Sequence, residues 1–316
     1  MKNSIQKLDC KKVEILLSSY NGERYIDTQL ESIFSQTYKN ITVSVRDDGS
    51  SDDTINILNN YKRKFKNLKI KASNNVGPTE SFVQLLKDVD SDSLYVAFAD
   101  QDDLWFDDKI SKAIECIQDL DPCIPVLYCS NVSLTDSELN ITKDRRWDKD
   151  LVHSFYNALL ENFVQGCTIV LNRAAVELIN SRTRDSKDII LHDWWIYLTC
   201  SMFGLIVYDN KPSMLYRLHT ENVAGHTEGL KLFVRRIQRL ISHDSFLDTK
   251  QVAIFLDCYR DIMPKTYIDF IEIFIYSCNH SNFLVRMNFF RKTACFKQSL
   301  VSDFLLKVLL SITPKK

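Results

Sequence analysis

Short apolar runs alternate with longer amphipathic stretches as far as Asp121, and this alternation limits the fold more than any other feature of the chain. The apolar runs are typical of buried strands: Val13–Ser19, Ile41–Asp47, Leu68–Ser73 and Leu94–Asp100. Helical periodicity marks the stretches between them: Glu23–Gln36, Asp53–Phe65 and Pro78–Lys87. Since strands that alternate with helices are joined by right-handed crossovers, the pattern predicts an α/β fold, with a mostly parallel sheet covered by helices on both faces.

The rest of the chain is less regular and ends in a helical region. Further strands are predicted at Pro125–Leu134, Val164–Asn172, Leu205–Tyr208 and Ser213–His219. Further helices are predicted at Arg173–Ser181 and His192–Phe203, and the pattern is helical from Gly229 onward. We therefore expect an α/β domain over residues 1–225, with halves of about 13–121 and 122–225, followed by a helical C-terminal appendage over residues 226–316.

Composition excludes several classes of protein. Forty Lys and Arg residues oppose 41 Asp and Glu, so the chain lacks a globally basic surface, and we expect no nucleic-acid partner. The nine cysteines are odd in number and form no Cys-x-x-Cys pair, which favours reduced, buried thiols. Met1–Lys12 lacks the apolar stretch of a secretory signal, and no apolar run reaches the roughly 18 residues of a membrane span. We therefore expect a cytoplasmic protein.

Polar residues follow three of the predicted strands, in the segments Ser18–Gly22, Asp47–Ser50 and Asp100–Asp103. Ligands of open parallel sheets bind beyond the carboxyl ends of the strands, so we expect all three segments to line one edge. A single acidic pair after a strand is more often a helix cap or a turn. Three such segments on successive strands indicate a ligand site.

The chemistry of these residues favours a diphosphate held by a metal. An ionised Asp47 can accept hydrogen bonds from a base or a ribose. Asp100 and Asp102 are spaced so that both can face one point, and carboxylates suit Mg²⁺ or Mn²⁺. Neither G-x-G-x-x-G nor the Walker pattern occurs, which points away from dehydrogenases and P-loop NTPases. The expected cofactor is therefore a divalent metal.

Five segments carry a resemblance to a known family: LLSSYNGERYIDTQLESIFSQTYKNITVSVRDDGSSDDT, VAFADQDDLWFDDKI, QGCTIVLNR, LHDWW and YRLHTENVAG. In this order, from Val13 to about Gly225, they resemble family-two glycosyltransferases of the GT-A (Rossmann-like) fold. DQDDLW, HDWW and the R-x-H-x-x-N ending are most similar to the bacterial rhamnosyltransferase branch that builds surface polysaccharides. The Gln-x-x-Arg-Trp motif of processive synthases is absent, so we expect transfer of one sugar or a few.

The resemblance implies a role for each matching residue. The nucleotide would be bound by Ser19, Tyr20, Glu23, Asp47 and Asp100, with Asp47 reading the pyrimidine and Asp100 touching the ribose. Asp102 would ligate the metal, with His219 as a further ligand, and Asp193 would be the catalytic base. Contacts to the diphosphate or the acceptor would come from Arg217, Asp103, Trp194 and Gly166.

Several of these residues also have a purely structural interpretation. Asp193 can cap the helix that begins near Trp194, and both of its roles can hold at once. His219 taken alone is typical of a core or surface histidine. Asp103 can be merely solvated. Aromatic side chains mostly pack in cores, which applies to Trp105, Trp194 and Trp195.

The implied function is inverting transfer of a sugar from a nucleotide-sugar donor, first of all dTDP-rhamnose, to a saccharide or lipid-linked saccharide acceptor. The alternatives are a UDP-hexose or UDP-N-acetylhexosamine donor, a non-catalytic nucleotide-sugar binder, and a metal-dependent nucleotide-sugar hydrolase. The basic helical segments Leu230–His243 and Ser281–Lys316 either pack on the catalytic domain or make a peripheral contact with the inner face of the cell membrane. The sequence leaves the oligomeric state unknown.

Overall fold

The computed structural model describes residues 11–183, 185, 187, 189–218 and 249–312. The chain separates into two compact units. The first comprises Met1–Leu151 and Val164–Asn222, and the second comprises Val152–Phe163 and Val223–Lys316. Residues 152–163 thus group with the C-terminal part of the chain, which no sequence pattern indicates.

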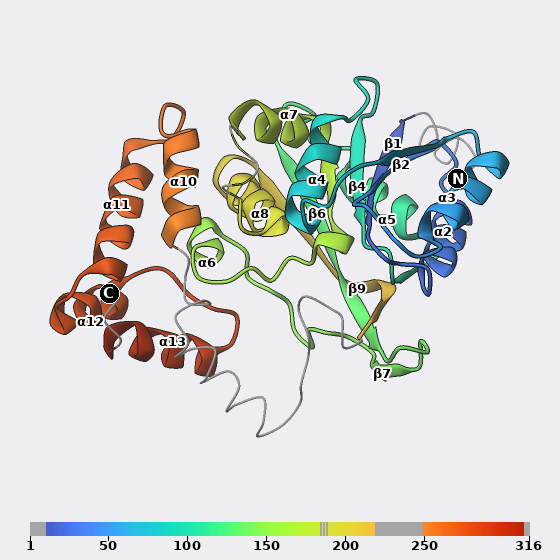
Figure 1. The fold of residues 1–316 in the computed structure, drawn as a ribbon. Helices are drawn as coiled ribbons and strands as arrows, with labels where there is room; N and C mark the ends of the chain where they lie inside the picture. The colour runs from blue at the N-terminus through green and yellow to red at the C-terminus, as the bar shows by residue number, and fades with distance from the viewer. Residues whose placement is uncertain (1–10, 184, 186, 188, 219–248, 313–316) are drawn as a thin grey trace. The chain divides into compact units, whose positions relative to one another are not determined.

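A nine-stranded mixed sheet, counted within the described residues, forms the centre of the first unit (Figure 1). Its strands are β1 (Val13–Ser19), β2 (Ile41–Asp47), β3 (Leu68–Ala72), β4 (Tyr95–Ala99), β5 (Leu104–Trp105), β6 (Val126–Thr135), β7 (Ile141–Lys143), β8 (Val170–Asn172) and β9 (Leu205–Arg217). Their order is β3-β2-β1-β4-β8-β6-β9-β5, and β7 pairs with β6. The first four strands are parallel, as the sequence predicts, whereas β8 runs antiparallel to both β4 and β6.

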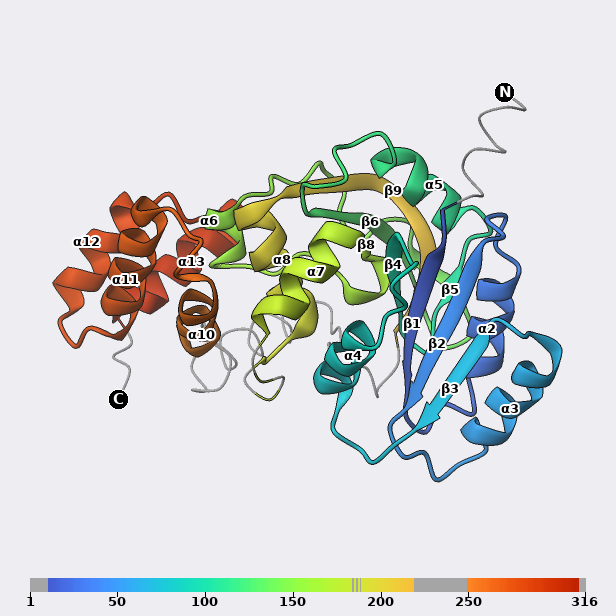
Figure 2. The same ribbon diagram turned by 90° about the horizontal axis from the view of Figure 1, so that it is seen from above.

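Helices cover both faces of this sheet. They are α2 (Ile26–Phe34), α3 (Thr54–Lys64), α4 (Pro78–Lys87), α5 (Lys109–Ile117), α7 (Arg173–Arg182) and α8 (His192–Phe203). Figure 2 shows α4, α7 and α8 gathered on one side of the sheet, while α2 and α3 lie on the other. The expected layers of an α/β fold are therefore present.

Burial on both faces explains why β1 is apolar without interruption from Ile15 to Leu17. Ile15 and Leu17 pack in the cluster that holds Leu30 of α2 and Leu58 of α3. Leu16, which alternates with them, is also fully buried. Strands of parallel sheets have this continuous apolar character because neither face meets water.

Two strand predictions were wrong in detail. Residues Val164–Asn172 form a 3₁₀ turn, η1 (Gly166–Thr168), before the short strand β8, because the N–H groups of Thr168 and Ile169 bond back to the carbonyls of Gln165 and Gly166. The two strands predicted between Leu205 and His219 are one strand, β9. His219 itself lies outside the described residues.

The second unit is helical. Its helices are α6 (Phe155–Ala158), α10 (Thr249–Tyr259), α11 (Lys265–Asn279), α12 (Phe283–Lys292) and α13 (Leu300–Ile312). Two basic side chains of Ser281–Lys316 make contacts within this unit. Arg286 is buried, and its Nη2 donates to the Ser311 carbonyl (2.9 Å). Lys307 forms an ion pair with Asp303 (2.8 Å). None of the helices in the described ranges is long and apolar enough to cross a bilayer. The segment Leu230–His243 lies outside those ranges.

Candidate active site

The polar ends of three parallel strands meet at one edge of the sheet. β1 lies between β2 and β4, and its last residue, Ser19, is in register with Asp47. Leu17 is in register with Ala99, so Asp100 follows β4 at the same edge. The three segments that the sequence singles out do share this edge.

Asp47 is buried, and both of its carboxylate oxygens accept hydrogen bonds from nearby residues. Oδ1 accepts from the backbone N–H groups of Gly49 (3.2 Å) and Ser50 (2.9 Å). Oδ2 accepts from the hydroxyls of Ser19 (3.0 Å) and Ser50 (2.6 Å). The turn requires glycine at position 49, where φ is +85°. Asp47 therefore fixes the turn after β2, and its base-reading role stays a prediction.

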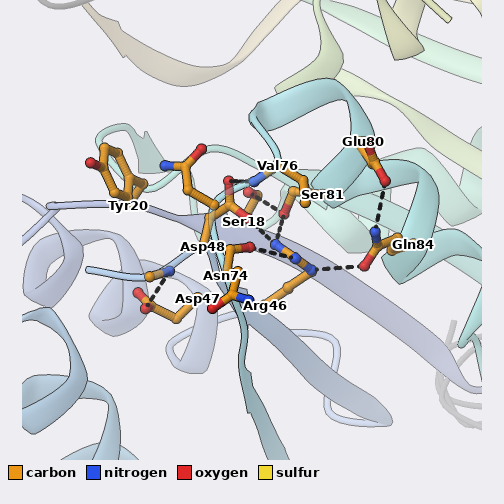
Figure 3. Close-up of polar contacts among 12 residues, drawn as sticks. Ser18, Tyr20, Arg46, Asp47, Asp48, Asn74, Val76, Glu80, Ser81 and Gln84 are labelled. Atoms are coloured by element: carbon orange, nitrogen blue, oxygen red, sulfur yellow. Dashed lines mark hydrogen bonds and ion pairs between the residues drawn. The ribbon is translucent and has the colours of Figure 1, made fainter. Parts of the chain in front are cut away.

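Arg46 and Asp48 form a buried ion pair that sequence reasoning missed (Figure 3). Oδ2 of Asp48 accepts hydrogen bonds from the N–H groups of Val76 (2.9 Å) and Gly77 (2.8 Å). The Arg46 guanidinium donates to the carbonyl of Asn74 (3.0 Å) and, through Nε, to Gln84 Oε1 (3.1 Å) on α4. The pair therefore ties the end of β2 to residues 74–77 and to α4. A signal was available: Arg46 stands near the end of a predicted strand, directly before two aspartates.

The loop after β1 carries Tyr20 and Glu23. Tyr20 is 47% exposed, and the Gln101 side chain bonds both its N–H (2.9 Å) and its carbonyl (3.1 Å). A Cβ on Gly22 would lie 2.3 Å from Gln101 Oε1, so this bridge needs glycine there. Glu23 Oε2 accepts the N–H of Asp53 at the start of α3 (2.8 Å). The loops after β1, β2 and β4 are thus mutually bonded, with the Tyr20 ring open to solvent.

Carboxylates gather after β4. The pKa of the Asp103 carboxyl lies well above its usual range because the group is buried beside Asp102 and Asp100. The pKa of Asp100 is raised to about 7, first by burial and then by the charges of Asp102 and Asp193. Both carboxyls therefore ionise less readily than an ordinary aspartate, first because they are buried and then because of the neighbouring negative charges.

Lys109 of α5 is a buried cation near this cluster, and sequence reasoning missed it. Its Nζ donates to the Cys167 carbonyl (3.0 Å) and to Ser213 Oγ (3.2 Å), and it lies 4.7 Å from the centre of the Trp105 ring. Burial lowers its pKa to about 8, against the opposing charges of Asp103 and Asp100. Trp105 is buried, as its structural interpretation predicts.

Arg217, at the end of β9, is bonded to the acidic turn. Its N–H donates to Asp103 Oδ1 (3.1 Å), and its Nε donates to the carbonyl of Asp102 (2.7 Å). Nη1 donates to the carbonyl of Ser137, and the guanidinium lies 4.6 Å from the centre of the Tyr25 ring. The residue expected at the diphosphate thus holds the turn that carries Asp102.

Asp193 lies in the first turn of α8, one residue after His192. Its Oδ1 accepts the N–H of Trp194 (2.7 Å), so it does bond the helix start, although Leu191 is the N-cap residue. Gly166 lies against this turn, because an added Cβ would be 2.9 Å from His192 Nε2 and 3.7 Å from Asp193 Cβ. Trp194 is 9% exposed, which agrees with a core role.

The residues after β4 fit a divalent cation. Oδ2 of Asp103 is buried and accepts no hydrogen bond among the described residues. The ligand atoms of Asp100, Asp103 and Cys167 all lie within 4.8 Å of one another. Carboxylate oxygens are preferred ligands of Mg²⁺ and Mn²⁺, and Asp102, the expected ligand, stands between two of these residues in the chain. His219, the other expected ligand, lies outside the described part.

Sequence comparison places the chain among glycosyltransferases. A family model described as glycosyl transferase family 2 matches residues 14–179. The dTDP-rhamnosyl transferase RfbG of Shigella flexneri is 32% identical over 232 residues, covering 70% of this chain and 78% of the relative. The UDP-Glc:alpha-D-GlcNAc-diphosphoundecaprenol beta-1,3-glucosyltransferase WfaP of Escherichia coli is 28% identical over 220 residues, covering 68% and 80%.

Solved structures with a similar fold include a UDP complex and a mannosyltransferase. S. aureus TarS 1-349 in complex with UDP superposes with a TM-score of 0.51 at 17% identity, covering 90% of this chain and 81% of that one. The mannosyltransferase PcManGT of Pyrobaculum calidifontis, in complex with GDP-Man and Mn²⁺, has a TM-score of 0.51 at 15% identity, with coverage of 95% and 80%. At these identities the likeness concerns the fold, and it confirms the expected GT-A architecture.

Proposed function

The chain belongs to glycosyl transferase family 2, and from this we propose that it moves a sugar from a nucleotide-diphosphate donor to a saccharide acceptor, with dTDP-rhamnose as the donor. The acidic edge of the sheet carries the proposal. There the charges of both Asp102 and Asp193 help to raise the pKa of Asp100. These two residues are expected to lie on opposite sides of the reacting sugar. The rhamnose donor is supported by the similarity to RfbG.

The proposed reaction is a single displacement with inversion at the anomeric carbon. Asp193 takes the proton of the acceptor hydroxyl as that oxygen attacks, because an unactivated hydroxyl is a poor nucleophile. Its Oδ1 is held by the Trp194 N–H, which orients the carboxylate, and we assign Oδ2 to the proton. Asp102 would hold a divalent cation, which would supply positive charge against the departing diphosphate. Arg217 keeps Asp102 in place through the backbone carbonyl of that residue.

A UDP-linked hexose is the second candidate for the donor. It is favoured by the glucosyltransferase WfaP, whose name specifies UDP-Glc. A thermal-shift panel of dTDP-rhamnose, UDP-glucose, UDP-N-acetylglucosamine and GDP-mannose, each with Mn²⁺ or Mg²⁺, separates the candidates. We expect the largest stabilisation with dTDP-rhamnose, because a ligand that binds only the folded state raises its stability in proportion to the logarithm of its concentration over Kd. A larger shift with a UDP-sugar rejects the rhamnose assignment.

Release of nucleoside diphosphate separates transfer from hydrolysis. For a transferase, the rate of release rises when a saccharide acceptor is added. A rate that is the same with and without a panel of lipid-linked saccharides indicates a hydrolase. A chain that binds the donor and never releases the diphosphate is a non-catalytic binder.

We also propose that the helical unit makes a peripheral contact with the inner face of the cell membrane, where lipid-linked acceptors are found. The support is an exposed apolar stripe at helical spacing on α13: Leu300 (85% exposed), Val301 (69%), Phe304 (67%) and Val308 (39%). The exposed Arg291 and Lys292 at the end of α12 suit anionic headgroups.

Vesicle flotation tests this contact. Phe304→Glu should abolish binding to anionic vesicles, while the matched control Ile141→Glu, at another exposed apolar position (55%), should not change it. Equal flotation of both variants rejects the stripe, and no flotation of the parent protein rejects the contact.

A further inference from the structure

Arg146 and Trp147 lie along strand β6, where hydrogen bonds fix their backbone. The Arg146 N–H donates to the Val132 carbonyl (2.9 Å). The Trp147 N–H donates to Asn131 Oδ1 (3.2 Å), and the Trp147 carbonyl accepts from Asn131 Nδ2 (2.7 Å). The Arg146 side chain therefore starts from a backbone position that two residues of β6 determine.

The Arg146 guanidinium is half-buried and forms no ion pair within the described residues. Asp148, two residues further along the chain, pairs with Lys143 instead (2.8 Å). Burial disfavours the charged form of Arg146 and lowers its pKa. A partly buried cation without a carboxylate partner is stabilised when an anion binds beside it.

The indole N–H of Trp147 is a second donor without an acceptor. Its Nε1 is buried and makes no hydrogen bond in the described ranges. The Arg146 guanidinium lies 5.9 Å from the centre of the Trp147 ring, so the two donor groups are neighbours. Guanidinium and indole groups donate hydrogen bonds and accept none. A ligand that suits both must therefore supply acceptor oxygens and negative charge.

Tyr216 of β9 relates Arg146 to the candidate active site. Val132, to which Arg146 bonds, belongs to the apolar cluster against which Tyr216 packs. Burial raises the pKa of the Tyr216 phenol, and so do the charges of Asp103 and Asp100, whereas the charge of Arg146 opposes this shift. The phenol thus lies within electrostatic reach both of Arg146 and of the carboxylates after β4.

We propose that Arg146, with the Trp147 indole beside it, forms a binding site for a phosphate group of a substrate. A planar guanidinium can donate two parallel hydrogen bonds to two phosphate oxygens. The proposal rests on the proposed function, which offers two sources of this chemistry: the diphosphate of the nucleotide-sugar donor and a phosphate group of a lipid-linked acceptor.

Inorganic pyrophosphate is the probe, because it carries the shared chemistry without a nucleoside, a sugar or a lipid. Isothermal titration into the full chain in EDTA measures its Kd without a contribution from divalent metal. The parent protein should bind pyrophosphate, and Arg146→Met should raise Kd at least about tenfold. Arg146→Lys should recover part of the affinity, because an ammonium keeps the charge but not the two parallel donors.

Arg145 provides the matched control. It is exposed, and its charge acts on Tyr208, whereas that of Arg146 acts on Tyr216. Arg145→Met removes the same charge one residue away and should leave the Kd of pyrophosphate unchanged.

Two further measurements identify the source of the phosphate group. If Arg146 binds the donor, Arg146→Met weakens dTDP binding by a similar factor and leaves KM for the acceptor unchanged. If Arg146 binds the acceptor, dTDP binding is unchanged and KM for a lipid-linked saccharide acceptor rises. No change in either quantity rejects a substrate phosphate at this site.

The outcomes separate the site from the function. The proposal is overturned by a parent that binds no pyrophosphate, by an unchanged Kd in Arg146→Met, or by an equal loss in Arg145→Met. If circular dichroism shows that Arg146→Met is unfolded, Arg146→Gln, which also removes the charge, decides by the same criterion. Loss of pyrophosphate binding in Arg146→Met, with a parent that transfers no sugar, refutes the proposed function alone. Unchanged pyrophosphate binding in Arg146→Met, with a parent that transfers sugar, refutes the phosphate site alone.

Discussion

The carboxylate of Asp193, in the first turn of α8, contributes to the raised pKa of Asp100 at the end of β4. Two groups that lie on different elements and far apart in the chain therefore act on one another through the folded protein. Asp102 acts on the same carboxyl. The expected base and the expected metal ligand are thus both electrostatic neighbours of Asp100.

Asp193→Asn tests the base. The amide oxygen of the substituted side chain can still accept the Trp194 N–H, so α8 and donor binding should be preserved, whereas turnover should fall by about 10²–10⁴ because the proton acceptor is lost. Donor Kd and kcat are measured together. A collapse of donor affinity, with kcat little changed, would show that Asp193 has a binding or structural role.

Asp102→Asn tests the ligand of the divalent metal. We expect the dependence of turnover on Mg²⁺ or Mn²⁺ to disappear together with turnover itself, since an amide is a much weaker ligand than a carboxylate. Isothermal titration with Mn²⁺, in the presence of nucleoside diphosphate, measures the loss of binding directly. Wild-type Mn²⁺ affinity in this variant would remove Asp102 from the site.

Arg217→Met tests the tie between β9 and the acidic turn. The substitution leaves the carbonyls of Asp102 and Ser137 without their guanidinium donor, so the free energy of unfolding should fall by about 1–3 kcal/mol and Mn²⁺ binding should weaken. Arg217→Lys should recover only part of the stability and of the Mn²⁺ affinity, because a lysine ammonium cannot reproduce the planar array of donors of a guanidinium. Urea unfolding and Mn²⁺ titration report the two effects. Full recovery with lysine would mean that charge alone matters.

His192 should make the fold sensitive to mild acid. Burial lowers its pKa below the usual 6.5, and its ring lies 4.4 Å from the centre of the Phe82 ring. The unfolded chain therefore takes up this proton at a higher pH than the folded chain, so stability is present above about pH 6.5 and is lost as the pH falls toward the folded pKa. Between about pH 7.5 and about pH 5, the urea midpoint of unfolding should decrease less with falling pH for His192→Asn than for the wild-type protein. Parallel pH profiles for the two proteins would contradict this.

The Arg46–Asp48 pair should behave as a coupled unit. Arg46→Met leaves a buried carboxylate without its cation, and we expect a loss of about 3–5 kcal/mol in the free energy of unfolding. Asp48→Asn should also destabilise, whereas the double variant should lose less than the sum of the two. A double-mutant cycle in urea measures the coupling, which we expect to be about 0.5–3 kcal/mol. Strict additivity would show that the pair contributes no mutual energy.

Local patterns predicted the first half of the fold well. Val13–Ser19 and Ile41–Asp47 are strands with the expected bounds. The apolar residues that form each strand and the turn residues that end it are adjacent in the sequence. Strand β9 was divided in the prediction because Asp209–Pro212 has the composition of a turn. The structure keeps it continuous by shifting its register against β6 near Asn131, which only the partner strand determines.

The candidate site, like the fold, was predicted from the sequence only in part. The edge shared by Ser19, Asp47 and Asp100 follows from strand order and was predicted. The contacts of Lys109 with Cys167 and Ser213 were not predicted, although Lys109 and Cys167 both stand in family segments, because these partners are far apart in the chain. Arg217 was found through its family resemblance, but its bonds to the acidic turn were visible only in the folded structure.

The irregular stretch of β9 has a consequence for how the molecule tolerates change. A strand turns successive residues to opposite faces, so the deletion of one residue near Pro212 would reverse the facing of everything after it, including Arg217. The acidic turn would then lose its support without the loss of any aspartate. A one-residue deletion in β9 should therefore abolish activity as completely as substitution of the reacting residues.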